Sequence, residues 1–291
     1  MSELALCMTA DAVEVGFGGT TLLRYLFRPD LARTDSPRPY AHPVRTLAGD
    51  EITAVGPEDH PWHLGISMAV ADVDGDNFWG GPTYVDGSGY RYREDHGEVR
   101  HRRWADVSVS ADSCELTEEL SWLAADGRVV LAEARVLRVD GVDPRFGRWM
   151  LHWSYRLRNV SDRCVRLGSP ATSGRSGAGY GGLFWRGAAT FRDGPVSTED
   201  ASGEHAVNGA SARSLTFTGE TAALTFASAD ADPATWFVRS AEYPGACPAL
   251  AFHDRLPLDP GGVLTGRYRF EITSRAAPGA TAAGEYRDRE S

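Results

Sequence analysis

A short stretch near residue 60 concentrates side chains that can move protons or bind metals. It reads Asp59-His60-Pro61-Trp62-His63, so two imidazoles and a carboxylate lie close together on a backbone restricted by proline. Histidine titrates near neutral pH, which suits it to acid-base catalysis, and its neutral ring is a common ligand of divalent metals. The stretch therefore predicts either a catalytic site at His60 and His63 or a surface turn in which one histidine caps backbone groups.

A second proline-fixed cluster lies upstream, at Arg38-Pro39-Tyr40-Ala41-His42-Pro43. Adjacent strands bring loop ends close together, so His42, His60 and His63 could converge. Three histidines with an open coordination position would form a divalent-metal site, and they would equally supply an acid-base group and hydrogen-bond donors to a sugar. The sequence leaves the cofactor open between none and one divalent metal.

Aromatic and arginine side chains offer the means to hold a ring-shaped ligand. Indole faces stack on the C–H faces of a pyranose, and guanidinium groups bind hydroxyls or carboxylates through paired hydrogen bonds. His152, in Leu151-His152-Trp153, is a third catalytic candidate if it faces the site rather than solvent. Candidates for a carboxylate base are Glu94, Asp95 and Glu98. The predicted substrate-binding residues are Arg38, Tyr40, His42, Trp62, Trp79, Tyr180, Trp185 and Arg186.

The composition narrows the classes of function. The chain has 291 residues, with 30 basic and 40 acidic side chains and a net charge of −10, which disfavours nucleic acid and anionic membranes as general partners. It contains no lysine, which excludes Schiff-base catalysis and lysine-dependent phosphate loops. No secretory signal and no apolar stretch of about 18 residues is present, and the four cysteines form no CxxC pair. We expect a reduced, cytoplasmic protein that acts on a small molecule.

Short apolar runs of β type recur between Gly, Asp, Pro and Ser residues along the chain. Thr21–Phe27, Cys114–Trp122 and Trp149–Leu157 are examples, and no long segment has helical periodicity. This pattern predicts an all-β antiparallel sandwich or barrel in a single domain over residues 1–274. Hairpin turns are expected at Ala124–Arg128 and Val139–Pro144.

Two less regular segments follow from the same analysis. The glycine-rich segment Gly168–Gly182 predicts a long loop that forms a lid or a site wall. Residues 275–291 lack apolar periodicity and predict a disordered tail.

Three segments together resemble a bacterial family of unknown function labelled PmoA-like: Arg38–Pro43, Asp59–Gly65 and Phe78-Trp79-Gly80. The family pattern resembles D-H-P-H-H-R-G followed by D-V-N-G-x-D-F-W, and the resemblance covers about residues 10–273. It implies a large β-sandwich similar to the galactose-mutarotase-like supersandwich, with His60 and His63 matching the family's histidines. Here Trp62 replaces a histidine and Leu64 an arginine. The methane-monooxygenase label does not fit, because that enzyme is embedded in a membrane.

These observations predict a carbohydrate-active enzyme, of epimerase, lyase or hydrolase type, acting on a sugar or an oxidised (keto) sugar. A histidine would transfer the proton, alone or with help from a metal. Two alternatives remain. One is a non-catalytic sugar-binding or sensing protein, and the other is an accessory biosynthetic enzyme whose cleft takes a non-sugar substrate.

Overall fold

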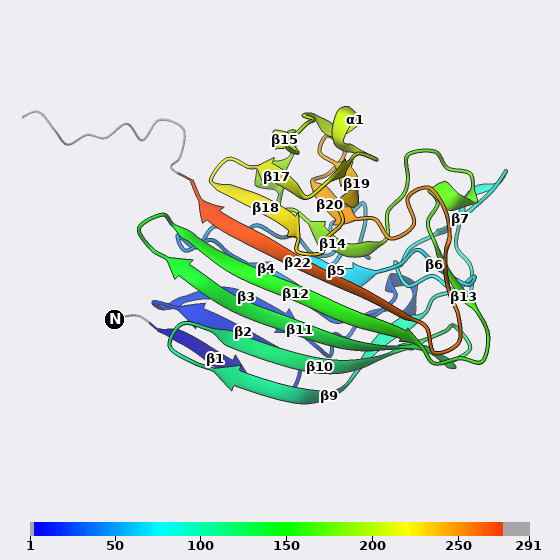
Figure 1. Ribbon diagram of the computed structural model, residues 1–291, viewed down its shortest axis with the longest axis horizontal. Helices are drawn as coiled ribbons and strands as arrows, with labels where there is room; N and C mark the ends of the chain where they lie inside the picture. Colours follow the sequence, from blue (N-terminus) through cyan, green and yellow to red (C-terminus); the bar gives the residue numbers. More distant parts are fainter. Residues whose placement is uncertain (1–2, 276–291) are drawn as a thin grey trace, which may run out of the picture.

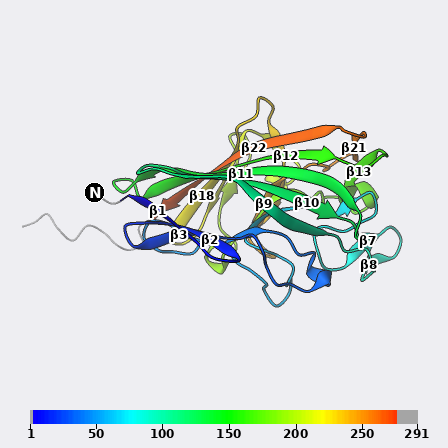
Figure 2. The ribbon, with the colours of Figure 1, turned by 90° about the horizontal axis from the view of Figure 1, so that it is seen from below.

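The computed structural model describes residues 3–275, and these residues form two large antiparallel sheets. The predicted tail therefore lies, apart from Arg275, outside the described residues. Every pairing between the named strands is antiparallel, and seen edge-on the two sheets form facing layers (Figures 1 and 2). The predicted all-β antiparallel sandwich is confirmed.

The first sheet has nine strands and the second has eight. In spatial order the nine-stranded sheet consists of β1 (Leu4–Met8), β2 (Ala12–Phe17), β3 (Thr20–Leu26), β4 (Tyr40–Val44), β5 (Ile66–Ala69), β14 (Gly182–Arg186), β20 (Gly245–Pro248), β19 (Ala234–Arg239) and β16 (Ser211–Ala212). The eight-stranded sheet consists of β15 (Val196–Ser197), β17 (Ser214–Thr218), β18 (Ala222–Ser228), β22 (Val263–Ser274), β12 (Arg148–Asn159), β11 (Val129–Asp143), β10 (Cys114–Leu123) and β9 (Glu98–Val109).

Smaller elements lie at one end of the sandwich and in the connections. A three-stranded sheet joins β21 (Leu256–Leu258), β13 (Val165–Gly168) and β6 (Asp72–Val73), and a hairpin joins β7 (Thr83–Val85) and β8 (Gly89–Arg91). The helical turns are η1 (Arg33–Asp35), η2 (Ala171–Ser173), η3 (Ala189–Phe191) and α1 (Glu204–Val207). No helix among residues 3–275 is long and apolar enough to cross a membrane.

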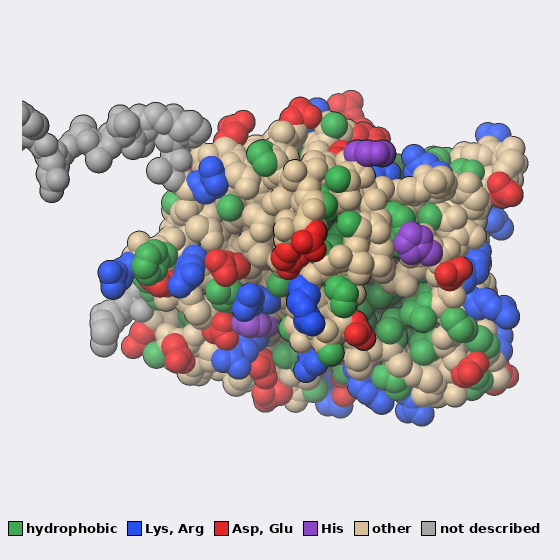
Figure 3. All heavy atoms as spheres, turned by 45° about the horizontal axis from the view of Figure 1, so that its top comes forward, with side chains coloured by type: hydrophobic (Ala, Val, Ile, Leu, Met, Phe, Trp, Pro, Cys, Tyr) green, Lys and Arg blue, Asp and Glu red, His purple; other side chains and the backbone are tan. Residues whose placement is uncertain are grey.

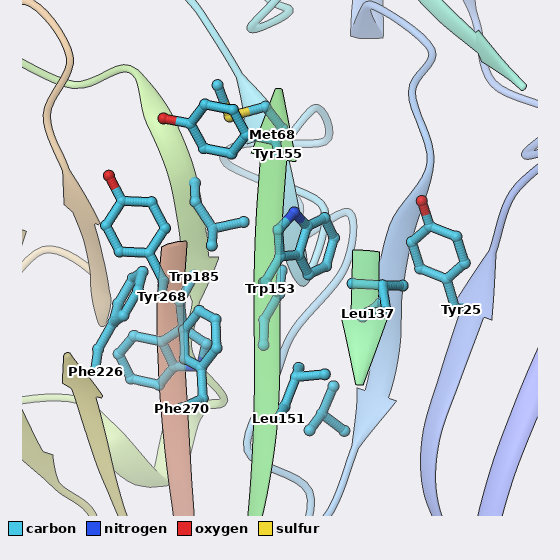
Figure 4. Packing of buried hydrophobic residues seen from close by; sticks show 14 of the residues in the cluster. Tyr25, Met68, Leu137, Leu151, Trp153, Tyr155, Trp185, Phe226, Tyr268 and Phe270 are labelled. Atoms are coloured by element: carbon cyan, nitrogen blue, oxygen red, sulfur yellow. The ribbon is translucent and has the colours of Figure 1, made fainter. Parts of the chain in front are cut away.

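The core between the sheets follows from strict alternation along the long strands. On β12 the side chains of Trp149, Leu151 and Trp153 are fully buried, while the residues between them point outward. Figure 4 shows Trp153 lying between Tyr25, on the opposite sheet, and the aromatic side chains of β22. Large aromatic side chains thus fill the space between the layers.

A polar network interrupts this apolar core. The alternation of β10 turns Glu118 inward, where its carboxylate accepts hydrogen bonds from Tyr25 Oη at 2.5 Å and His101 Nδ1 at 2.7 Å. Arg135 donates to Tyr25 Oη at 2.8 Å and pairs with Glu133 at 2.7 Å. Hydrogen bonds to each charged group offset the cost of burying it. The network joins β3 to β9, β10 and β11 across the sandwich.

The two expected hairpin turns have different outcomes. The turn at Ala124–Arg128 is present, with a hydrogen bond from Ala124 N to Arg128 O at 2.9 Å and Gly127 at φ +85°. The turn expected at Val139–Pro144 is wrong, because β11 continues to Asp143 and the chain reverses after it. Gly141, at φ +60°, lies where the pairing with β12 is irregular, so the glycine marks a bulge rather than a turn.

Candidate functional site

The candidate site lies on the outer face of the nine-stranded sheet, over β5, β14, β19 and β20. Along β14, Leu183 and Trp185 point into the core, so Phe184 and Arg186 project from the opposite face. Phe237 on β19 projects from that face in the same way. A second apolar cluster, separate from the main core, therefore covers this part of the sheet: Ala69, Trp79, Ala178, Tyr180, Phe184, Phe237, Tyr243 and Cys247.

A pocket of about 290 Å³ opens in this cluster. Its aromatic lining consists of Trp62, Trp79, Tyr90, Tyr180, Phe237 and Tyr243. His60 and His63 form one part of the wall, and the charged groups in the lining are Arg175, Arg239 and Glu242. Figure 3 shows a different face of the molecule, over which acidic and basic side chains are spread among apolar ones. A concave aromatic surface with a few polar groups is typical of small-molecule sites.

Tight turns position the two histidines. His63 N donates to His60 O, and Gly56 N donates to His63 O, each at 2.9 Å. Gly65 adopts φ +43°, and a Cβ atom there would collide with the carbonyl oxygen of Ala41. Only glycine meets both requirements at this position, which fixes the direction in which the loop enters β5.

Arg38 ties this loop to the one that carries Trp79. Its guanidinium is fully buried and donates to Trp62 O at 2.9 Å, Trp79 O at 3.0 Å, Ser36 O at 3.0 Å and Asp35 O at 3.1 Å. Burial lowers the pKa of Arg38 to about 9. Its Nε donates to Ser67 Oγ at 3.2 Å, and the other four acceptors are main-chain carbonyls, so Arg38 positions the aromatic loops and is not free to bind a ligand.

The histidines form an ordered pair with a carboxylate on one side and a guanidinium on the other. His60 Nδ1 lies 2.6 Å from Asp59 Oδ2, and the His60 and His63 rings stack with centroids 4.5 Å apart. Arg186 Nη1 donates to His63 Nδ1 at 3.3 Å. Burial, then the nearby His60 and Arg186, hold the pKa of His63 well below its usual value. His63 is therefore neutral with its proton on Nε2, because its Nδ1 accepts a hydrogen bond.

The carboxylate beside His60 stays ionised. Burial raises the pKa of Asp59, but the hydrogen bond from His60 and the charge of His60 together lower it by more than burial raises it. The pKa of Asp59 is therefore below its ordinary value. Asp59 thus holds the proton of His60 on Nδ1 and leaves Nε2 as the atom that can accept a proton.

Tyrosines and an arginine form the opposite wall. The hydroxyls of Tyr90 and Tyr180 lie 3.0 Å apart, and Arg175 donates to Tyr90 Oη and lies over its ring. Burial raises the pKa of Tyr180 well above its usual value and also raises that of Tyr243. Both hydroxyls therefore remain protonated near neutral pH.

Five of the predicted residues meet in this pocket: His60, Trp62, His63, Trp79 and Tyr180. Arg186 lies behind them, buried against His63 and 4.4 Å from the centre of the Tyr243 ring. The glycine-rich loop contributes Arg175 and Tyr180 to the lining.

Other predicted residues lie elsewhere, and the prediction for them is corrected. Arg38 is occupied by backbone carbonyls. Trp185 is buried in the main core, where its Nε1 donates to Ile52 O at 3.0 Å. Tyr40 is buried on β4 and does not line the pocket. His152 lies on the outer face of β12, half-exposed and 2.9 Å from Asp140, so the strand alternation points it away from the sandwich interior.

His42 does not join the other two histidines. Its Nδ1 contacts Thr53 Oγ1 at 3.0 Å, and its Nε2 lies 3.7 Å from Glu51. Among residues 3–275, no group of three or more His, Cys, Asp or Glu side chains is arranged to hold a metal ion. The metal site of His42, His60 and His63 is therefore not formed in this structure, because His42, on β4, lies beside Thr53 and Glu51.

Six further lining residues are not predicted from the sequence: Tyr90, Arg175, Phe237, Arg239, and Glu242 and Tyr243 on the turn between β19 and β20. Glu94, Asp95 and Glu98, the predicted carboxylate candidates, do not line the pocket, and Glu242 does. No local motif marks these residues; only the packing of distant strands brings them to the histidines.

Comparisons with known proteins give a family and two similar structures. The fold is similar to a galactose 1-epimerase from Lactobacillus acidophilus, with 8% identity, TM-score 0.39 and coverage of 95% of this chain and 99% of that one. It is also similar to an aldose epimerase homologue from C. elegans, with 8% identity, TM-score 0.35 and coverage of 95% and 100%. At this identity the likeness identifies no substrate. No curated protein matches the chain.

A family model matches residues 12–287, close to the extent expected from the three motifs. Its description is a family of unknown function and carries no PmoA designation. Because the match covers most of the sequence, the chain belongs to this family of unknown function, DUF6807.

Proposed function

We propose that the pocket binds a sugar-like ring and that His60 transfers a proton to or from it. The observation that carries this proposal is the Asp59–His60 pair, 2.6 Å apart, on the wall of an aromatic pocket. A carboxylate that holds Nδ1–H orients the imidazole and stabilises it when Nε2 takes up a proton. Aromatic faces hold the ring, while His63 Nε2–H donates a hydrogen bond to one of its oxygens.

Epimerisation at the anomeric carbon is the reaction that the lining supports best. A base removes the proton of the anomeric hydroxyl, an acid protonates the ring oxygen, the bond from C1 to that oxygen breaks, and closure on the other face of the carbonyl reverses these transfers. His60 and Glu242 both line the pocket and provide the two groups that this requires. The same pair would serve elimination, hydration or hydrolysis on a keto sugar.

The rate at which the anomers of a sugar interconvert tests the proposal directly. The protein is added to freshly dissolved single anomers of glucose, galactose, mannose and xylose, and the approach to equilibrium is followed by NMR. We expect acceleration with at least one sugar, and a loss of about 10²–10⁴-fold in His60→Ala while binding of that sugar persists. Keto sugars are screened in parallel for elimination, hydration or hydrolysis.

The structure offers a matched control in His152→Ala. His152 also pairs with an aspartate, but on the exposed face of the other sheet, so its replacement should leave turnover unchanged. Binding without any turnover by the wild-type protein would contradict catalysis and favour a sugar-binding or sensing role. Absence of any sugar binding would overturn both and direct screening to the non-sugar substrates of a biosynthetic pathway.

A further inference from the structure

We propose that the ligand is an uncharged oligosaccharide whose reducing unit lies in the aromatic pocket and whose second unit lies in a polar pocket adjoining it. This inference rests on the function proposed above, because it takes the ring beside His60 as the first unit of the ligand.

The two pockets are neighbours of equal size. The second pocket also has a volume of about 290 Å³, and Trp79, Gly80, Pro82 and Tyr180 line both. The rings of Trp79 and Tyr180 are 4.5 Å apart between centroids, so this pair forms the partition. A ligand longer than one ring could leave the aromatic pocket over this partition and enter the second pocket.

The hairpin of β7 and β8 spans both pockets. Tyr84 lines the second pocket and Tyr90 lines the aromatic one, and these two residues are paired directly across the hairpin with ring centroids 5.5 Å apart. The contacts of Tyr90 with Tyr180 and Arg175 fix the hairpin over the partition. One hairpin therefore presents an aromatic side chain to each unit of a two-unit ligand.

The lining of the second pocket indicates a ligand without net charge. Two carboxylates, Asp72 and Asp86, are balanced by two guanidinium groups, Arg93 and Arg255, and Arg255 lies 2.7 Å from Asp72. Among residues 3–275, neither the Asp86 carboxylate nor the Tyr84 hydroxyl makes a side-chain hydrogen bond, so both remain available. Mixed donors and acceptors suit the hydroxyls of a sugar, whereas an ion would meet a group of like charge.

Paired ligands test this inference on the whole protein. The probes are free glucose, galactose, mannose and xylose, together with disaccharides in which the same pyranose is the reducing unit and carries the second unit at O3 or O4. Affinity is measured by calorimetric titration, and saturation-transfer NMR maps which ring contacts the protein. We expect at least one disaccharide to bind about tenfold more tightly than the free monosaccharide, because the second unit adds hydrogen bonds.

A bulky side chain in the second pocket provides the matched pair of variants. Ser173 lines that pocket, whereas Ser176, in the same loop, is exposed and does not. Ser173→Trp should abolish the advantage of the disaccharide and leave binding of the monosaccharide unchanged, and Ser176→Trp should change neither. Circular dichroism checks the fold of both variants.

The outcomes separate this inference from the proposed function. If a monosaccharide binds but no disaccharide gains affinity, or if Ser173→Trp leaves the gain intact, the second subsite is refuted and the aromatic site stands. If none of the probes binds, the proposed function fails, and this inference fails with it.

Discussion

Replacing Arg38 by methionine removes a buried set of hydrogen bonds while keeping most of the side-chain volume. The carbonyls of Ser36 and Trp79 are fully buried, so each would lose its partner at a cost of about 1–3 kcal/mol. Those of Asp35 and Trp62 lie nearer the surface, where water can replace the guanidinium in part. The charge of Arg38 is itself costly to bury, so removing it offsets part of this loss. We expect a net loss of about 3 kcal/mol in the free energy of unfolding.

Urea denaturation measures this loss, and Arg33→Met is the matched control. Arg33 also donates to loop carbonyls, those of His96, Ala124 and Ala125, but its side chain is 46% exposed. Water can therefore replace it, and we expect a cost below about 1 kcal/mol. If Arg38→Met destabilises the protein no more than Arg33→Met does, the buried carbonyls do not depend on Arg38 and the assigned positioning role is wrong.

Three further predictions concern stability. Glu118→Gln should cost about 3 kcal/mol in urea denaturation, because a buried carboxylate that accepts from two side chains becomes a neutral amide; an unchanged midpoint would contradict this. Because the pKa of His63 is lowered in the folded protein, the unfolded chain binds more protons than the folded one once the pH falls below about 6.5, and acid therefore lowers stability. The Tm of His63→Gln should fall less between pH 7 and 5 than that of the wild-type protein. An identical fall in the two proteins would refute the assignment. Gly81→Ala should cost about 1–3 kcal/mol more than Gly87→Ala, because both glycines have positive φ but only at position 81 would a Cβ lie 2.5 Å from the Trp62 ring; equal thermal shifts would count against it.

Part of the site could be predicted because its residues are neighbours in the sequence. His60, Trp62 and His63 share one loop, and proline and glycine around them fix its turns. The long strands were also recognisable from their alternation, as in β12. By contrast, Glu242 comes from a turn whose composition gives no signal, and it reaches the pocket only through the pairing of β19 with β20.

The roles of Arg38 and Trp185 could not be predicted, for physical reasons. Backbone carbonyls accept most hydrogen bonds of the buried Arg38 guanidinium, and every residue has such a carbonyl, so these partners cannot be recognised in the sequence. The sequence therefore suggests that Arg38 is available for a ligand. The segment Leu183-Phe184-Trp185 is apolar on both faces of the sheet and shows no alternation. Which of its side chains faces the pocket depends on the strand register, and a shift of one residue exchanges the faces.

The apolar side chains on both faces of β14 also affect how the chain folds. This strand pairs with β5, far earlier in the sequence, and with β20, well after it. Long stretches of chain that contain several other strands separate it from both partners, and pairing across such distances in sequence slows folding. Until then a segment with strong β propensity and little charge is exposed to other chains. We therefore expect the yield of refolding to fall as protein concentration rises, with association starting at this central strand.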